Sequence, residues 1–457
     1  MDLLIYKLKR MSNTLIKEVH IVNEGQIFVS DILIKDDRIE KIAPEIGNIS
    51  FNHDEIDGYK LHLFPGLIDD QVHFREPGMT YKADIHSEAR AAVAGGITSF
   101  MEMPNTVPQA VTQELLEEKY QIGAARSLAN YSFYMGATNT NLDEIKKTDK
   151  RRVCGVKIFA GSSTGNMLVD DPKTLEGIFS ECDHLIAVHS EKEEVIRRNL
   201  EIFKQQFGDN IPMKAHPAIR SIEACFTSSE KLVTMAKRFG TRLHILHIST
   251  AEELALFRND IPLKDKKITA EGCVHHLWFD ASDYDTLGGL IKCNPAIKEA
   301  RHKQAILKAV LDGTIDILAT DHAPHTWEEK QNPYLQCPSG LPLAQHSLQM
   351  MLDFYADGKI TLEQIADKMC HAPAVCFKVE ERGYVREGYK ADLVLVDLNK
   401  PYEVNKSNIY YKCGWSPLEG HTFKSSIVST YVNGHMAFDR GSFYEDRQGE
   451  RLTFSVS

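Results

Sequence analysis

The stretch PGLIDDQVHFREPG (residues 65–78) begins as a short apolar run and ends in a group of polar residues. If the run is a strand, the alternation of its side chains places Asp69, Gln71 and His73 on one face. Pro77 and Gly78 then close the segment as a turn. This is the form expected of a buried strand that delivers polar side chains to its carboxyl end.

Seven later runs have the same form, in which apolar residues are followed by polar ones. They are residues 97–105, 131–138, 155–161, 185–191, 242–250, 267–277 and 315–325. Amphipathic segments at 112–129 and 225–240 are typical of helices between such strands. Eight strands that alternate with helical crossovers predict an α/β protein of the (β/α)8 class, a TIM-like barrel.

The two ends of the chain have a different sequence pattern. Residues 14–64 contain short Val- and Ile-rich runs broken by turn residues, and residues 383–398 and 425–441 alternate in the same way. Asn433-Gly434 stands where a two-residue hairpin turn fits. We therefore expect a small β-sandwich domain formed by both termini. The predicted division is 1–64 and 377–457 for the β domain and 65–376 for the barrel.

The composition narrows the class of partner. Of the 457 residues, 43% are hydrophobic and 26% are charged, which allows a sizeable core. A net charge of -11 and a pI near 6.0 disfavour nucleic acid and anionic membranes, because both select basic surfaces. A small-molecule substrate is therefore expected.

The cysteines and the N-terminal residues indicate the cellular compartment of the protein. Nine cysteines without a CxxC pair indicate reduced thiols in the cytoplasm rather than structural disulfides. The N-terminal MDLLIYKLKR has charges inside its apolar patch, unlike a secretory signal, and no later segment is predicted to span a membrane. Strand-like alternation starts after Met11, so the first ten residues are expected to be a frayed extension or the product of an upstream start.

Polar residues at the ends of the predicted strands form the candidate site, since these ends meet at one mouth of a parallel barrel. A single strand-end histidine more often makes a structural hydrogen bond than binds a metal. Here three histidines, one aspartate and one lysine converge from five strands, which favours a metal site: His73, Lys157, His189, His247 and Asp321. Imidazole and carboxylate donors suit zinc, but the lysine must first lose its charge or become an acid.

These residues stand in motifs that resemble the dihydroorotase family, within the metal-dependent cyclic amidohydrolases. The resemblance covers nearly the whole chain, including the β segments at both ends. Its motifs are PGLIDDQVHFREPG, MPNT, GVKIFAGSSTGNMLV, VHSE, LHILHIST, CNPAIKE and ATDHAPHTWEEK.

The resemblance implies a role for each residue of the metal site. Lys157 would be N-carboxylated, and its carbamate would bridge two Zn2+ ions. His189 and His247 would hold one ion, and His73 would hold the other together with Asp321. Asp321 would also act as the catalytic general acid and base.

The resemblance also implies the substrate. Arg75, Asn105 and His325 match positions that bind a carboxylate, and Asn294 matches one that contacts the ring. A planar guanidinium suits the first role because it pairs with both carboxylate oxygens. The implied reaction is the reversible zinc-dependent hydrolysis of (S)-dihydroorotate to N-carbamoyl-L-aspartate in pyrimidine biosynthesis. The resemblance also suggests a homodimer.

Gln71 is the main departure, since the family pattern has a histidine there. It would either be a weaker zinc ligand than imidazole or hydrogen-bond a neighbouring ligand. Two alternative functions therefore stay open. One is an allantoinase or hydantoinase that acts on a different ring. The other is an inactive barrel that serves as a partner of aspartate transcarbamoylase.

Other features receive structural interpretations. His275 and His276 are adjacent on a predicted strand, so at most one of them should line the barrel. His244 lies three residues before His247 and is expected to face away from it. Ser221 is a candidate helix N-cap.

Overall fold

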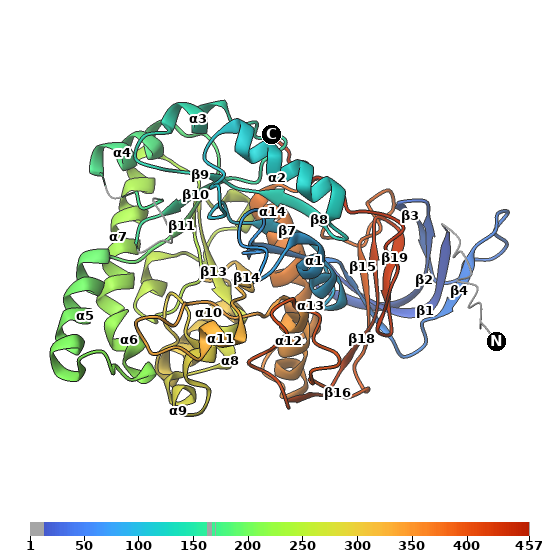
Figure 1. The fold of residues 1–457 in the computed structure, drawn as a ribbon. Helices are drawn as coiled ribbons and strands as arrows, with labels where there is room; N and C mark the ends of the chain where they lie inside the picture. Colours follow the sequence, from blue (N-terminus) through green and yellow to red (C-terminus); the bar gives the residue numbers. More distant parts are fainter. Residues whose placement is uncertain (1–12, 162–166, 170, 457) are drawn as a thin grey trace.

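The computed structural model describes residues 13–161, 167–169 and 171–456, so the predicted frayed extension of the first ten residues lies outside them. A barrel ringed by helices stands beside a sheet that contains strands from both ends of the chain (Figure 1).

Parallel strands form the barrel, and their eight positions confirm the predicted fold. The third position is shared by β8 and β9, which Tyr134 separates. The barrel closes between β14 and β6, where the His73 amide donates to the carbonyl of His322 over 2.7 Å. The strands are β6 (Leu67–Val72), β7 (Ile97–Glu102), β8 (Asn130–Phe133), β9 (Met135–Gly136), β10 (Val156–Phe159), β11 (Ile186–His189), β12 (Leu243–Ile245), β13 (Ile268–Cys273) and β14 (Ile317–Ala319).

Helices cover the outside of these strands (Figure 1), which explains why the strands are buried. In α7 the predicted cap is confirmed, because the Ser221 hydroxyl accepts from the amide of Ala224 at 3.4 Å. The same helix ends at Gly240 with φ of 71°, a conformation that glycine adopts readily. The longer helices are α1 (Ile85–Ala94), α2 (Gln113–Arg126), α4 (Pro172–Glu181), α5 (Glu193–Phe207), α7 (Ile222–Phe239), α10 (Ala300–Asp312) and α12 (Ser347–Ala356).

Strands from both ends of the chain form one mixed sheet. β5 joins its two halves, since it pairs in parallel with β1 and antiparallel with β15. The predicted hairpin turn is confirmed: Asn433 and Gly434 have φ of 49° and 72°. The strands are β1 (Thr14–Asn23), β2 (Gln26–Lys35), β3 (Arg38–Ala43), β4 (Asp54–Asp57), β5 (His62–Pro65), β15 (Leu393–Asp397), β18 (Ser426–Val432), β19 (His435–Asp439) and β20 (Ser442–Phe443).

The predicted strand at 267–277 is too long, because its last part is the short helix α8 (Val274–Trp278). The strand interpretation of His275 and His276 is therefore wrong. Successive helical side chains are about 100° apart rather than on opposite faces, so both rings can turn to the same side.

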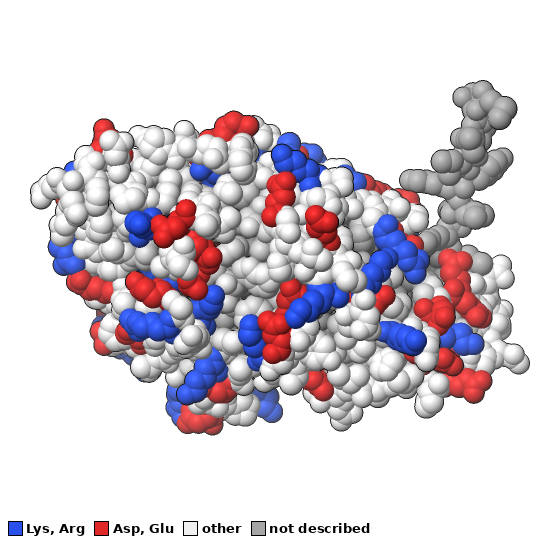
Figure 2. Space-filling model, turned by 90° about the horizontal axis from the view of Figure 1, so that it is seen from below, with Lys and Arg blue, Asp and Glu red and all other residues white. Residues whose placement is uncertain are grey.

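All nine cysteines are free. On the face in Figure 2, acidic and basic side chains are interspersed. In the described part of the chain, every helix is too short or too polar to cross a bilayer.

Candidate active site

A cavity of about 270 Å3 opens at the carboxyl ends of the barrel strands. All ten residues singled out from the sequence line it, although they come from positions up to 254 residues apart (71 to 325). They are Gln71, His73, Arg75, Asn105, Lys157, His189, His247, Asn294, Asp321 and His325. Their individual roles stay predictions, but one cavity contains them all.

The backbone is strained at three of these residues. Arg75, His247 and Asp321 have φ of 68°, 40° and 46°, in the left-handed region that side chains other than glycine rarely adopt. Each lies just beyond the end of a barrel strand. Such strain costs about 1–3 kcal/mol per residue and persists where surrounding structure holds a functional side chain in place.

His189 and His247 are the first pair of predicted zinc ligands. Nδ1 of His189 lies 3.0 Å from Nε2 of His247. Burial lowers the pKa of both rings, so both are neutral and can donate lone pairs. The Glu191 carboxylate lies 3.0 Å from Nε2 of His189 and fixes the proton there, which leaves Nδ1 as the donor atom. Two nitrogens on one tetrahedral zinc would be about 3.3 Å apart, close to the observed separation.

Lys157 lies in the middle of β10 and is only 1% exposed. Its Nζ is 4.6 Å from the centre of the Phe159 ring. Among the described residues no carboxylate lies within ion-pair distance of it, so burial lowers its pKa to about 7. Much of the amine is therefore neutral at neutral pH, and the neutral amine is the form that can react with CO2.

His73 and Asp321 are the second pair of predicted zinc ligands. Nδ1 of His73 lies 2.9 Å from the Asn105 side-chain oxygen and donates its proton there. Nε2 then carries a lone pair, and it faces the Asp321 carboxylate at 3.3 Å. Two electron-rich atoms face each other in this way when a cation or a proton lies between them. Both pairs thus fit the predicted zinc ligands in donor type and orientation.

Gln71 contacts the catalytic candidate directly. Its amide Nε2 donates to Oδ1 of Asp321 at 3.1 Å, while its oxygen lies 4.0 Å from the Cys273 sulfur. An amide that donates to a ligand positions that ligand and does not coordinate through the same atom. Of the two interpretations of Gln71, these contacts favour the hydrogen-bonding one.

We expect Gln71→Leu to lower kcat about tenfold, because the loss of a hydrogen bond to a charged group releases the Asp321 carboxylate. KM and zinc content should stay within about twofold of wild type. Steady-state kinetics and elemental analysis measure both, with Gln205→Leu on the exposed face of α5 as the control. A loss of zinc with little change in kcat per zinc would instead identify Gln71 as a ligand.

Arg75 is the centre of a second group of residues in the cavity lining. Its Nε donates to the Pro324 carbonyl at 3.1 Å, and Nη2 lies 3.1 Å from Nε2 of His325. No carboxylate of the described chain pairs with it, although it is only 6% exposed. Burial lowers its pKa to about 10, so it is still charged at neutral pH. A buried guanidinium without an acidic partner is a receptor for an anion.

His325 is held in a neutral form beside this guanidinium. Burial lowers its pKa, and Lys82 donates to its Nδ1 at 2.9 Å. Lys82 is in turn paired with Glu329 at 2.9 Å. This ion pair holds the His325 ring in place beside Arg75.

Several contributors were missed from the sequence. Glu191 supports His189, and Glu271 accepts from the amide of His247 at 2.8 Å. Each is a single acidic residue beside a histidine motif, and that position is only a weak indication of a supporting role. The loop residues 338–340 also line the cavity, and no periodicity marks them. Phe159 lines it too, and its position two residues after Lys157 in β10 could have predicted this. His244 is structural as predicted: it is fully buried, with its Nε2 3.2 Å from Asp70.

The comparison with family models decides the class. The amidohydrolase family model matches residues 62–437, most of the chain. The chain belongs to the amidohydrolase family. This amidohydrolase is a hydrolase that acts on cyclic amides, which its relatives also support.

Relatives of this amidohydrolase divide between activities. The dihydroorotase of Halobacterium salinarum is 31% identical over 414 residues, covering 90% of this chain and 94% of that protein. The allantoinase of Deinococcus radiodurans is 29% identical over 432 residues, covering 93% and 94%. Among solved structures, the L-hydantoinase from Arthrobacter aurescens superposes with a TM-score of 0.91 at 26% identity, covering 97% of this chain and 100% of that one.

The metal-free protein is expected to become more stable as pH rises above about 7. The Lys157 pKa is about 7 when folded, against a usual value of 10.5, so between these values the unfolded chain binds more protons. The free energy of unfolding therefore increases with pH across that window, and the full cost of burying the charge is present below it. Lys157→Met should remove the rise and stabilise the zinc-free protein by roughly 3 kcal/mol near pH 6.

Urea unfolding of zinc-free protein at a series of pH values measures this effect. Lys359→Met, at a half-exposed lysine paired with Asp357, is the control and should leave the pH slope unchanged. Parallel curves for wild type and Lys157→Met would contradict the prediction.

Proposed function

We propose that this amidohydrolase is a dihydroorotase that interconverts (S)-dihydroorotate and N-carbamoyl-L-aspartate. The observation that carries the proposal is the buried Arg75 guanidinium, which lines the cavity without an acidic partner among the described residues. Dihydroorotate bears a carboxylate on its ring, and an uncharged ring would leave this buried charge uncompensated.

The substrate would lie between the two centres of the cavity. Arg75 receives the carboxylate, with the neutral His325 and Asn105 beside it, and Asn294 faces the ring. This binding presents the amide carbonyl to the residues at the strand ends. Orientation of that kind contributes a large part of the rate enhancement of enzymes.

Asp321 would transfer the proton in both halves of the reaction. Its carboxylate, which accepts a hydrogen bond from Gln71, takes the proton of the attacking water as the tetrahedral species forms. It returns that proton to the ring nitrogen as the C–N bond breaks. The reverse reaction uses the same group in the opposite order.

Zinc is the metal that these donors suit. His189 and His247 would hold one ion, His73 and Asp321 the other, and Lys157 as a carbamate would bridge them. When bound, zinc supplies Lewis acidity and lowers the pKa of water toward neutrality. Lys157 supports this assignment because burial already favours its neutral form.

A second candidate is an allantoinase or hydantoinase activity. It is favoured by the 29% identity to an allantoinase and by the similarity to an L-hydantoinase fold. A panel of dihydroorotate, allantoin and hydantoin, tested on zinc-loaded protein, separates the two. We expect kcat/KM to be highest for dihydroorotate. A higher value for allantoin or hydantoin would overturn the dihydroorotase proposal.

The proposal includes the cellular compartment and the assembly state of the enzyme. Reduced cysteines suit the cytoplasm, and a homodimer is expected, with association with aspartate transcarbamoylase as a further expectation. Light scattering of the purified chain, alone and mixed with aspartate transcarbamoylase, measures both assemblies. A monomer that does not change mass on mixing would contradict them.

A further inference from the structure

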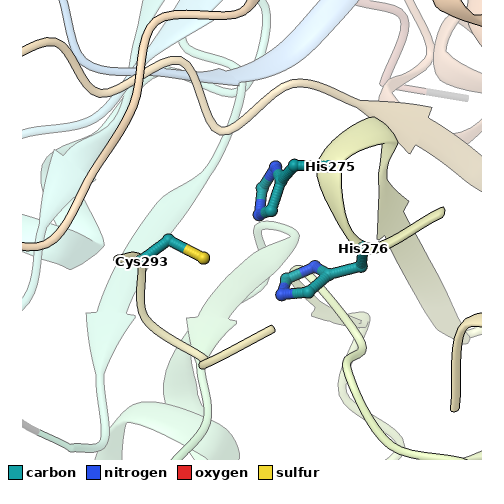
Figure 3. Close-up of side chains that lie close together, drawn as sticks. All are labelled: His275, His276 and Cys293. Atoms are coloured by element: carbon teal, nitrogen blue, oxygen red, sulfur yellow. The ribbon is translucent and has the colours of Figure 1, made fainter. Parts of the chain in front are cut away.

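A second group of potential metal donors lies outside the lining of the catalytic cavity. It consists of His275 and His276, both in α8, and Cys293 from a different segment. One donor atom from each lies within 4.8 Å of the others, and all three residues are buried. Figure 3 shows the sulfur and the two rings turned toward one another.

The hydrogen bonds of His276 select its donor atom. Nε2 lies 3.1 Å from the Pro295 carbonyl, which can only accept, so this nitrogen carries the proton. Nδ1 then has a lone pair, and it has no hydrogen-bond partner in the described chain. A metal-binding histidine is commonly oriented in this way, by donating its other N–H to a backbone carbonyl.

His275 provides an independent observation. It is fully buried, and its contact with the backbone of Thr320 falls short of good hydrogen-bond geometry, so at least one ring nitrogen has no partner in the described chain. Leaving a buried polar group without a partner costs about 1–3 kcal/mol, so such a group calls for an explanation. Together the two rings present unpaired nitrogen atoms beside a thiol.

Cys293 completes the set as a soft ligand. Its thiol donates to the same Pro295 carbonyl over 3.3 Å, which is a weak interaction that a metal bond can replace. Hard ions such as Mg2+ and Ca2+ prefer oxygen donors, whereas two imidazoles and a thiolate suit Zn2+.

We propose that His275, His276 and Cys293 bind one Zn2+ ion, at a site separate from the catalytic centre. On binding, Cys293 releases its proton to solvent as the sulfur–zinc bond forms, and each ring donates one lone pair without a change of oxidation state. Asn294 follows Cys293 and lines the catalytic cavity. The ion would therefore fix this wall of the cavity to α8.

Substitution of cobalt for zinc tests the site in the full-length protein. A thiolate bound to Co2+ gives a charge-transfer band in the near ultraviolet, and none of the proposed catalytic ligands is a cysteine. We expect the band in wild type and in Lys157→Ala, and its loss in Cys293→Ser. Cys273→Ser is the matched control, since Cys273 is equally buried and lies 4.0 Å from Gln71, and should keep the band.

Elemental analysis of the zinc form should show one fewer zinc per chain in Cys293→Ser than in Cys273→Ser. Absence of the band in cobalt-loaded wild type would overturn the proposal without reliance on any variant. A band that survives Cys293→Ser would overturn it as well. Because the readout is a spectrum that is independent of Lys157, its failure is distinct from a failure of the catalytic assignment.

Discussion

Asp321→Asn should lower kcat about a thousandfold, with substrate binding nearly unchanged. An amide cannot accept the proton of the attacking water or return it to the ring nitrogen, and a well-placed general acid and base contributes about 10²- to 10⁴-fold. The strained backbone at Asp321, with φ of 46°, indicates that the surrounding structure holds this side chain in one position. Steady-state kinetics with dihydroorotate measures the effect.

The control for this prediction separates proton transfer from metal loss. Zinc content is measured alongside turnover, because the same carboxylate faces His73 at 3.3 Å. Asp260→Asn, at an exposed carboxylate paired with Arg258, should keep wild-type activity. If Asp321→Asn retains zinc and more than about a tenth of wild-type kcat, Asp321 is not the general acid and base.

Arg75→Met should raise KM for dihydroorotate about a hundredfold. Methionine keeps much of the side-chain volume but removes two charge-assisted hydrogen bonds to the carboxylate, each worth about 1.5–3 kcal/mol. Because no carboxylate of the described chain pairs with Arg75, the loss of its charge should not by itself unfold the protein. Initial rates over a wide range of substrate concentration give KM and kcat separately.

The matched control for Arg75 is Arg301→Met, at an exposed arginine paired with Glu252. It should leave KM unchanged. A KM for Arg75→Met within about threefold of wild type would contradict the carboxylate-binding role, and with it the main argument for dihydroorotate over an uncharged ring.

The barrel could be predicted because its strands carry their signal locally. Each is a short apolar run that is buried on both faces, and each is followed by polar residues where the strand ends. His189 is the last residue of β11, and Asp321 stands two residues beyond β14. Strand ends meet at one mouth in this fold, so the pattern also predicted which side chains would share a cavity.

Features that depend on distant partners could not be read in the same way. Gln71 donates a hydrogen bond to Asp321, 250 residues away in the sequence, and only the fold brings the two together. Glu191 and Lys82 act through His189 and His325, so their own surroundings in the sequence do not mark them. Helix α8 was predicted as strand because VHHL is too short for its period to be recognised.

The most direct test of the account is a zinc titration of metal-stripped protein, with dihydroorotate turnover and bound zinc measured at each step. We expect turnover to be absent without zinc and to rise as the catalytic centre fills, with full activity despite Gln71. Titration of the Cys293→Ser protein under the same conditions measures zinc binding to the catalytic centre without the proposed additional site. Turnover that is independent of zinc, or zinc-saturated protein that does not hydrolyse dihydroorotate, would contradict the central claim.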